Sequence, residues 1–516
     1  MYAGRKRKAF ANIFAYILYF SITTIIGLVS RKIFLENLGS QLLGLTELLT
    51  SIISMLALVE LGFGSAIYFS LYKPLTENNI SEIQGIMQFY RKIYGIIGGM
   101  VFALGLFIIP FLPYIVDSNI DKAILYKVYL IFLVDSVFSY FLTYRRTIIC
   151  ADQKEYIATA ADTITYLLTV GLQIWSVIFT KNIYVFLIIK VLMALIRNVF
   201  LYIYAGSKYF YIKDHKKVPL SESTKKELIN NVKAIFLGNI GGYIITGTDN
   251  LYLSIFADLS AIYIYSNYKL IINMINGVFN QIFAYMKANI GNYIVLHSPK
   301  ENYALFKKFF FANYILTQYT SISMFVLINL FMEFWIGKEY CWSLFIVFLI
   351  LAKNYASMMN QALEAFRAAA GLFAPKKIYR YIALIEAGLN VFFSLFFLKY
   401  LNMGIAGIFA GTVVSNMISV CVVPFMTYKY LFQNSIRTYI KKYICYLLNT
   451  LLYGSICAVI VRGFDNFHIV IQVVLGILVC FIVPEMGNVI IYSRTEEFKY
   501  FRNLLKKSIR KTLKYE

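Results

Sequence analysis

Long apolar stretches recur along the whole of this sequence, and short polar segments separate them. A helix of roughly 20 apolar residues spans the hydrocarbon core of a bilayer, and fourteen such stretches can be placed between residues 10 and 492. Only 15% of the 516 residues are charged, whereas a soluble domain of average composition has roughly 25%. The sequence therefore predicts an all-α, polytopic membrane protein of about fourteen transmembrane helices.

The positively charged residues predict how these helices are oriented. The predicted spans are 10–35, 41–72, 93–116, 126–149, 157–179, 182–204, 232–257, 259–286, 309–336, 341–365, 378–398, 403–424, 443–461 and 468–492. Segments on the side of the N-terminus carry 37 Lys and Arg residues, the opposite side carries eight, and four lie within spans, which accounts for all 49. Because cytoplasmic loops are enriched in Lys and Arg, we expect both termini in the cytoplasm. The net charge of +23 thus reflects topology and does not indicate a nucleic-acid partner.

The longest inner segment, 205–231, divides six spans from the eight that follow. A weak internal repeat supports this division, since the sequence around Arg145 resembles that around Arg367 at an offset of 222 residues. Parallel repeats of this kind occur in several transporters; chance similarity between apolar sequences is the alternative. The predicted domains are a six-helix lobe over 1–215, a second six-helix lobe over 216–428, and two additional helices with a basic amphipathic tail over 429–516.

Two helix starts carry capping-box patterns, in which a hydroxyl group and a Glu or Gln three residues later satisfy free backbone N–H groups. These are Ser81 with Gln84 before the third span, and Thr224 with Glu227 before the seventh. We expect the two helices to begin at these residues.

Nine charged residues lie well inside predicted spans, where a charge at the bilayer centre costs roughly 2.5–3.5 kcal/mol on insertion scales. They are Glu47, Glu60, Asp135, Asp162, Lys190, Asp249, Lys269, Lys353 and Glu386. One interpretation is that they form pairs that hold helices together. We favour a second interpretation for the set, in which several face a polar cavity, because nine such residues exceed what packing requires.

Arg31 and Lys32 end the first span on the outer side, against the general distribution of positive charge. A stripe of Ser and Thr residues that ends at Ser30 leads to them. One explanation is that the two side chains reach for outer headgroups. The functional explanation is an anion site, because the planar arginine fork can donate two hydrogen bonds at once to a phosphate.

Glycines accompany two of the acidic residues. Glu60 stands beside Gly62 and Gly64 in the second span, and glycine costs about 1 kcal/mol relative to alanine inside a helix. We therefore expect a bend there. The seventh span has four glycines before Asp249 and Asn250, which indicates either a flexible helix or close helix packing.

The sequence contains no motif of an enzyme, a nucleotide site or a metal site. Its six cysteines form no CxxC pattern and its three histidines are scattered, which disfavours a disulfide framework and a zinc site. We expect neither an enzyme nor a resident cofactor.

A set of short segments keeps its order and spacing over roughly residues 10–425. They include Arg31-Lys32-Ile33-Phe34, Glu60-Leu61-Gly62-Phe63-Gly64, Ala151-Asp152-Gln153-Lys154, Thr248-Asp249-Asn250, Ser266-Asn267-Tyr268 and Gly404-Ile405-Ala406-Gly407. In these segments the sequence resembles the bacterial polysaccharide repeat-unit flippases of the multidrug/oligosaccharidyl-lipid/polysaccharide exporter superfamily. The last two spans and the tail carry no motif of this kind.

This resemblance implies a function. Such flippases move an oligosaccharide on an undecaprenyl pyrophosphate carrier from the inner to the outer leaflet of the bacterial cytoplasmic membrane, for surface polysaccharide biosynthesis. Two lobes alternate between inward-open and outward-open states around a central cavity. Coupling to an H+ or Na+ gradient would supply the energy, because no nucleotide site is present in the sequence.

The resemblance also implies roles for individual residues. The candidates for pyrophosphate binding are Arg31, Lys32, Lys269 and Lys353. The candidates for contact with the substrate or a coupling ion are Glu47, Glu60, Asp249, Asn250 and Asn267. The candidates for a cytoplasmic gate or loop are Arg145, Lys154, Arg367 and Lys376. Lys269 stands where the family pattern leads us to expect a neutral residue.

The expected partners are the lipid-linked oligosaccharide, anionic membrane lipids under the basic tail, and other polysaccharide assembly proteins. A monomer would suffice, because one chain holds both lobes. The alternatives are a multidrug or cation exporter or a lipid II flippase of the same superfamily. A membrane polysaccharide polymerase or ligase is less favoured, because the outer loops are short.

Overall fold

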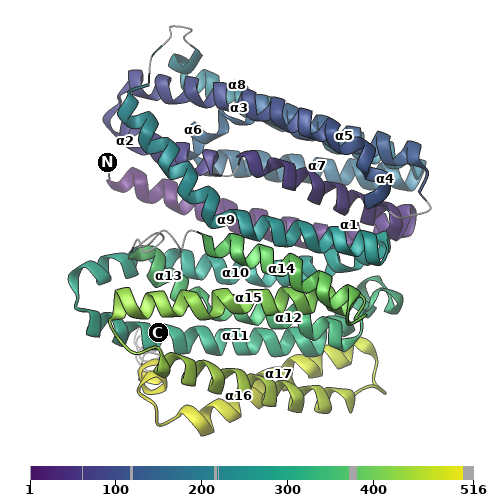
Figure 1. Ribbon diagram of the computed structural model, residues 1–516, viewed down its shortest axis with the longest axis vertical. Helices are drawn as coiled ribbons and strands as arrows, with labels where there is room; N and C mark the ends of the chain where they lie inside the picture. Colours follow the sequence, from purple (N-terminus) through teal and green to yellow (C-terminus); the bar gives the residue numbers. More distant parts are fainter. Residues whose placement is uncertain are drawn as a thin grey trace, which may run out of the picture. The chain divides into compact units, whose positions relative to one another are not determined.

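A computed structural model of the chain describes residues 2–60, 62–116, 120–213, 218, 220–370 and 381–503. These residues form helices joined by short connections, and none of them forms a β-strand (Figure 1). Within the described part of the chain, ten helical segments are long and apolar enough to cross a membrane. One of them, Ala15–Leu56, covers most of the first predicted span and the first half of the second. The prediction of an all-α polytopic membrane protein is confirmed.

The chain divides into two compact units, Met1–Tyr265 and Ser266–Glu516. The helices of the first unit are α1 (Tyr2–Leu56), α2 (Phe63–Glu77), α3 (Ile80–Ile108), α4 (Leu112–Ile115), α5 (Lys122–Thr143), α6 (Arg146–Ala151), α7 (Glu155–Thr180), α8 (Ile183–Lys208), α9 (Glu222–Phe256) and the start of α10 (Leu259–Leu296). Three 3-10 turns, η1 (Ala57–Glu60), η2 (Ile109–Phe111) and η3 (Phe210–Lys213), lie between them. The predicted boundaries between the two lobes and the C-terminal helices, at residues 215 and 428, rest on the internal repeat in the sequence and stay a prediction.

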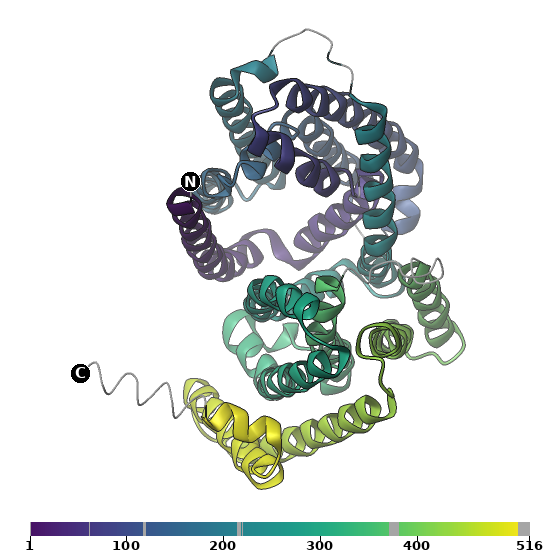
Figure 2. The same ribbon diagram turned by 90° about the vertical axis from the view of Figure 1, so that its left-hand side faces the viewer.

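The second unit contains the remainder of α10 and seven further helices. These are α11 (Pro299–Ile336), α12 (Leu344–Met359), α13 (Gln361–Ala369), α14 (Ile382–Lys399), α15 (Ile405–Thr427), α16 (Arg437–Arg462) and α17 (Ile469–Tyr492), with a 3-10 turn at Lys338–Tyr340 and a π-helical turn at Tyr428–Phe432. Seen nearly end-on, the helices of each unit run roughly alongside one another (Figure 2). Each of the fourteen predicted spans is mostly helical in its described part.

The backbone departs from helix at two points, one between the first two predicted spans and one within the second. The backbone is helical on both sides of Gly39, but Gly39 itself has φ 80° and ψ 161°, and the chain turns back there. A second break follows η1, where Gly62 has φ 95°, a left-handed conformation that glycine adopts without steric cost. A Cβ atom on Gly62 would lie 2.7 Å from the Val232 carbonyl oxygen of α9. The bend predicted beside Glu60 is therefore confirmed.

The two predicted capping boxes are wrong, because both helices begin earlier. The side chain of Asn79 caps α3 by accepting the backbone N–H of the third helical residue, so Ser81 lies inside the first turn. The side chain of Ser221 caps α9 in the same way, so Thr224 lies inside the helix. In each case a polar residue further upstream was available and took the cap position.

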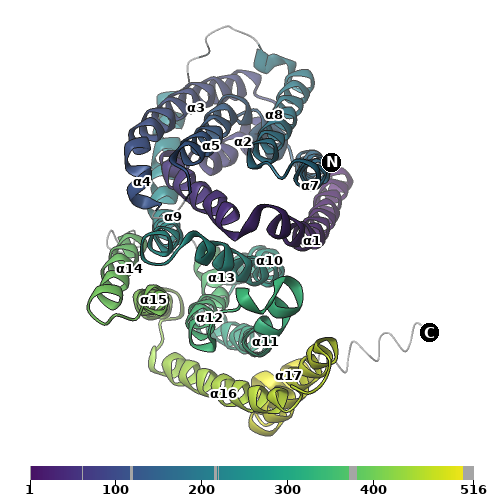
Figure 3. The same ribbon diagram turned by 90° about the vertical axis from the view of Figure 1, so that its right-hand side faces the viewer.

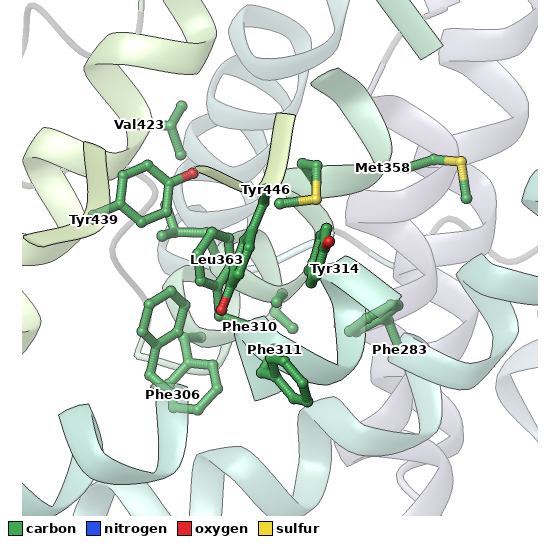
Figure 4. Close-up of a cluster of buried hydrophobic side chains, with 14 of the residues drawn as sticks. Phe283, Phe306, Phe310, Phe311, Tyr314, Met358, Leu363, Val423, Tyr439 and Tyr446 are labelled. Carbon is green, nitrogen blue, oxygen red and sulfur yellow. The ribbon is translucent and has the colours of Figure 1, made fainter. Parts of the chain in front are cut away.

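A cluster of aromatic side chains fills the core of the second unit (Figure 4). The rings of Tyr314 from α11 and Tyr446 from α16 stack with centroids 3.8 Å apart and an interplanar angle of 6°. Both rings meet Tyr492 of α17 at a steep angle. The two C-terminal helices α16 and α17 therefore share a core with α11, beside which they lie in Figure 3.

Candidate functional site

The turn at Gly39 brings two predicted site residues into contact. Arg31 precedes the turn and Glu47 follows it, and Arg31 Nη2 lies 2.5 Å from Glu47 Oε1. Their side chains keep 21% and 32% of their exposure, so the pair is reachable from outside the packed helices. Tyr263 of α10 donates a hydrogen bond of 3.5 Å to the Arg31 carbonyl oxygen. The sequence indicated both as candidate site residues, but it did not indicate that they form an ion pair.

A second group of charges lies between α5 and α8. Lys190 of α8 interacts electrostatically with Asp135 of α5 and with Glu47 of α1. Asp135 also interacts with Arg197, which lies two helical turns beyond Lys190 on α8. The Lys190 ammonium lies 4.6 Å from the centroid of the Phe132 ring, which adds a cation–π contact.

A third group joins α6, α7 and α8. Arg146 donates two hydrogen bonds to Asp162, one from Nη1 to Oδ1 (2.9 Å) and one from Nη2 to Oδ2 (2.6 Å). Arg197 approaches the same carboxylate, with Nε 3.6 Å from Oδ1. The sequence indicated Asp162 as a charged residue within a span but pointed to no role for Arg146 or Arg197. Asp162 lies seven residues into α7, roughly 10 Å along the helix at 1.5 Å per residue.

These groups make one series of neighbouring charges in the first unit, which we call the charge ladder; ion pairs join the residues at its two ends, and longer-range electrostatic interactions link the ends through Lys190 and Asp135. Its members, in order, are Arg31, Glu47, Lys190, Asp135, Arg197, Asp162 and Arg146. Each carboxylate lies between two cations, which offsets the cost of holding charges away from water. Four cations face three carboxylates, so the ladder carries one surplus positive charge. It extends from the turn at Gly39 to α6, and its surplus charge suits an anionic ligand.

Three other predicted residues of the first unit lie on neighbouring helices. Glu60, at the break before α2, accepts a hydrogen bond from the Tyr94 hydroxyl of α3. Asp249 of α9 is 3% exposed and accepts a hydrogen bond of 3.3 Å from the Tyr265 hydroxyl. Asn250 donates one of 2.6 Å to Ser51 Oγ of α1, while its own Oδ1 is buried without a hydrogen-bond partner in the described part of the chain.

The other predicted pyrophosphate ligands do not join the charge ladder. Lys32 is exposed on α1, and Lys269 lies half-buried on α10 in the second unit, next to the fully buried Asn267. Lys353 of α12 lines a cavity of about 690 Å³ inside the second unit, bounded by α11, α12, α15 and α16. Among the described residues that line this cavity, Lys353 is the only charged one. Glu386, a further charged residue of the spans, accepts hydrogen bonds within the second unit from α15.

The predicted gate residues each contact their own unit. The guanidinium carbon of Arg145 lies 3.7 Å from the Tyr202 ring centroid, and its Nη1 donates to the Tyr202 carbonyl oxygen at 3.3 Å. Lys154 forms an ion pair with Asp152. Arg367 Nη2 lies 2.6 Å from Glu364 Oε2 one turn away. Lys376 lies outside the described residues, and a gating role for the others stays a prediction.

Solved structures of membrane transporters share this architecture. Lipid II flippase MurJ in an inward closed conformation matches with a TM-score of 0.65 at 14% sequence identity, over 93% of this chain and 98% of that chain. The chain therefore shares the fold of this flippase. A Vibrio cholerae MATE transporter matches with a TM-score of 0.56 at 12% identity, over 84% of this chain and 99% of that chain.

An inward-facing multidrug resistance MATE family transporter of the MOP superfamily also matches, with a TM-score of 0.54 at 12% identity, over 78% of this chain and 92% of that chain. No protein-family model matches the sequence, and no curated protein does. The fold implied by the resemblance of the sequence motifs is therefore confirmed. At 12–14% identity the substrate must be argued from the residues of this chain.

Proposed function

We propose that this protein moves an oligosaccharide linked to undecaprenyl pyrophosphate from the inner to the outer leaflet of the bacterial cytoplasmic membrane. The observation that carries the proposal is the charge ladder, which places one surplus cation within a unit built from apolar helices. Charged residues inside membrane-spanning segments usually mark the pathway of a substrate or an ion. The sequence motifs that resemble polysaccharide flippases point to the same class of substrate.

The sign of the surplus charge separates this proposal from a cation exporter. Four cations against three carboxylates would repel a cationic drug and attract a diphosphate, which arginine binds through paired hydrogen bonds. In this proposal Arg31 binds the diphosphate near the predicted outer end of the first unit. Glu47 forms its ion pair with Arg31 while no diphosphate is bound. Asp249 and Asn250, which are buried on α9, are the proposed contacts for a coupling ion.

Replacement of Arg31 tests this role in a bacterial strain whose surface polysaccharide depends on the protein. We expect Arg31→Ala to lower surface polysaccharide at least tenfold, and Arg31→Lys to retain part of it, because lysine keeps the charge and loses the fork. Lys122→Ala is the matched control, since Lys122 is exposed at the start of α5 and lies outside the charge ladder. Normal polysaccharide in Arg31→Ala cells with normal amounts of the protein would remove Arg31 from the proposal.

A lipid II flippase is the second candidate, and the fold similarity to MurJ favours it. Depletion of the lipid II flippase in a host cell, with this protein expressed in its place, distinguishes the two. We expect no rescue of growth if the substrate is a polysaccharide repeat unit. Rescue would replace the proposed substrate with lipid II and would leave the argument for an anionic, diphosphate-bearing substrate intact.

A further inference from the structure

The arginine pair Arg146 and Arg197 lies far along the charge ladder from Arg31, and no role has yet been given to it. Arg146 uses both terminal nitrogens of its guanidinium on Asp162. Arg197 has only a longer contact of 3.6 Å with the same carboxylate. Two guanidinium groups at this corner of the unit thus share one carboxylate at close range, and the second positive charge is balanced at longer range by Asp135.

Within the group formed by Arg146, Arg197 and Asp162, Arg197 is the residue with hydrogen-bond donors available for a ligand. Its Nε and Nη2 make two long hydrogen bonds of 3.3 Å to the neighbouring Asn198 Oδ1. Its Nη1 donates to no acceptor in the described part of the chain. A guanidinium carries five N–H donors in a fixed fork, so Arg197 can bind a further anion without giving up its place beside Asp162.

The corner is also reachable by a ligand. The side chains of Arg146 and Arg197 keep 30% and 33% of their exposure, and that of Asp162 keeps 15%. A guanidinium that faces hydrocarbon carries a large cost, so we expect the exposed edge to face water or headgroups. The hydroxyl of Tyr19 on α1 lies within electrostatic reach of all three side chains, and the adjacent Tyr16 and Phe20 rings stack at 6.2 Å.

We propose that Arg146 and Arg197 form a second anion site, near the predicted inner end of the first unit, that takes the diphosphate headgroup of a lipid before it reaches Arg31. The identity of the ligand rests on the function proposed above. Asp162 pairs with both arginines while the site is empty, as Glu47 does with Arg31. Lys190 and Asp135 connect the two sites, so a diphosphate can exchange one cationic partner for the next along the charge ladder.

The test measures binding by the full chain, purified in nanodiscs of neutral phosphatidylcholine. Farnesyl diphosphate is the probe, with farnesyl monophosphate and farnesol for comparison. We expect the affinity to fall in that order. Inorganic pyrophosphate should compete at higher concentration, because the site recognises the headgroup while the membrane concentrates the lipid-linked form. Equal affinity for farnesol and farnesyl diphosphate would overturn the proposal, since it would show that the headgroup is not recognised.

Substitutions then locate the site. Arg197→Gln should weaken binding of farnesyl diphosphate about tenfold, the effect of losing one charge-assisted hydrogen bond, and Arg197→Lys should weaken it less. Lys208→Gln, an exposed change of the same kind at the end of the same helix, should leave it unchanged. Binding by Arg197→Gln that equals wild type would overturn the proposal.

A second variant covers the case in which Arg197→Gln does not fold. Asp162→Asn removes the carboxylate that competes with the ligand, so it should tighten binding of farnesyl diphosphate about tenfold. Unchanged or weaker binding would show that Asp162 only holds the helices together, and would overturn the proposal. Binding of farnesyl diphosphate by Arg31→Gln separates failure of this second site from failure of the proposed function. This variant lacks the first site and keeps the second intact, so its binding reports the second site.

Discussion

Replacement of Gly44 by alanine perturbs the closest approach of α1 to α10. A Cβ atom at Gly44 would lie 1.8 Å from the Leu259 carbonyl oxygen and 2.6 Å from its carbonyl carbon. Real Cβ atoms essentially never come within 3.0 Å of such atoms. The two backbones would therefore have to separate by at least about 1.2 Å, and a backbone cannot swing aside as a flexible side chain can.

Overpacking of this kind costs roughly 1–3 kcal/mol, against a gain of about 1 kcal/mol for alanine over glycine in a helix. We expect the Gly44→Ala protein to melt several degrees below wild type in detergent, when unfolding is followed by size-exclusion chromatography after heating. Gly171→Ala on α7 is the matched control, because nothing lies within 4 Å of the added Cβ. That variant should be as stable as wild type or slightly more so. Equal melting temperatures for the two variants would refute the close approach.

Two further predictions concern contacts outside the charge ladder. Burial alone would raise the pKa of Glu497, but the hydrogen bond from Lys442 Nζ (2.6 Å), a backbone hydrogen bond and the charges of Lys442 and Lys307 together outweigh it and lower that pKa. The pair therefore stabilises the fold above the ordinary glutamate pKa and loses its effect as the pH falls. The melting-temperature difference between wild type and Glu497→Gln should shrink from about pH 7 to about pH 4, and a difference independent of pH would contradict this. At Arg145, Tyr202→Leu should destabilise the protein by roughly 1–2 kcal/mol and Tyr202→Phe by less, because phenylalanine keeps the ring for the cation–π contact; equal melting temperatures would contradict it.

The fold could be predicted from the sequence because its main determinants act locally. Apolar length sets where helices lie in a membrane, and the distribution of Lys and Arg sets their predicted direction. The break beside Glu60 was predictable because glycine disfavours helix at Gly62 whatever surrounds it. The helix starts at Asn79 and Ser221 were not, because several polar residues competed for each cap position and the packing of the whole helix decided between them.

The candidate site was predictable as a set of residues and not as an arrangement. Arg31 and Glu47 stood out as charges in or beside apolar segments, and the gap between the first two predicted spans placed a turn near Gly39, but the sequence did not show that the two side chains meet across that turn. Arg197 carried the same signal as Lys190, a cation within a span, but its partner Asp162 lies on a different helix. Which face of a helix meets which neighbour is set by tertiary packing, and one sequence does not contain that information in readable form.

Movement of a lipid-linked oligosaccharide by the purified protein is the most direct test of the central claim. The protein is reconstituted into liposomes that hold a fluorescent oligosaccharide on polyprenyl diphosphate, and a membrane-impermeant glycosidase outside reports which leaflet holds it. We predict that the protein brings to the outer leaflet the labelled lipid that starts in the inner leaflet, so that the cleaved fraction of the label rises from about half to nearly all. We expect Arg31→Ala to slow this rise at least tenfold. Cleavage that stops at the same fraction in protein-containing and protein-free liposomes would contradict the account.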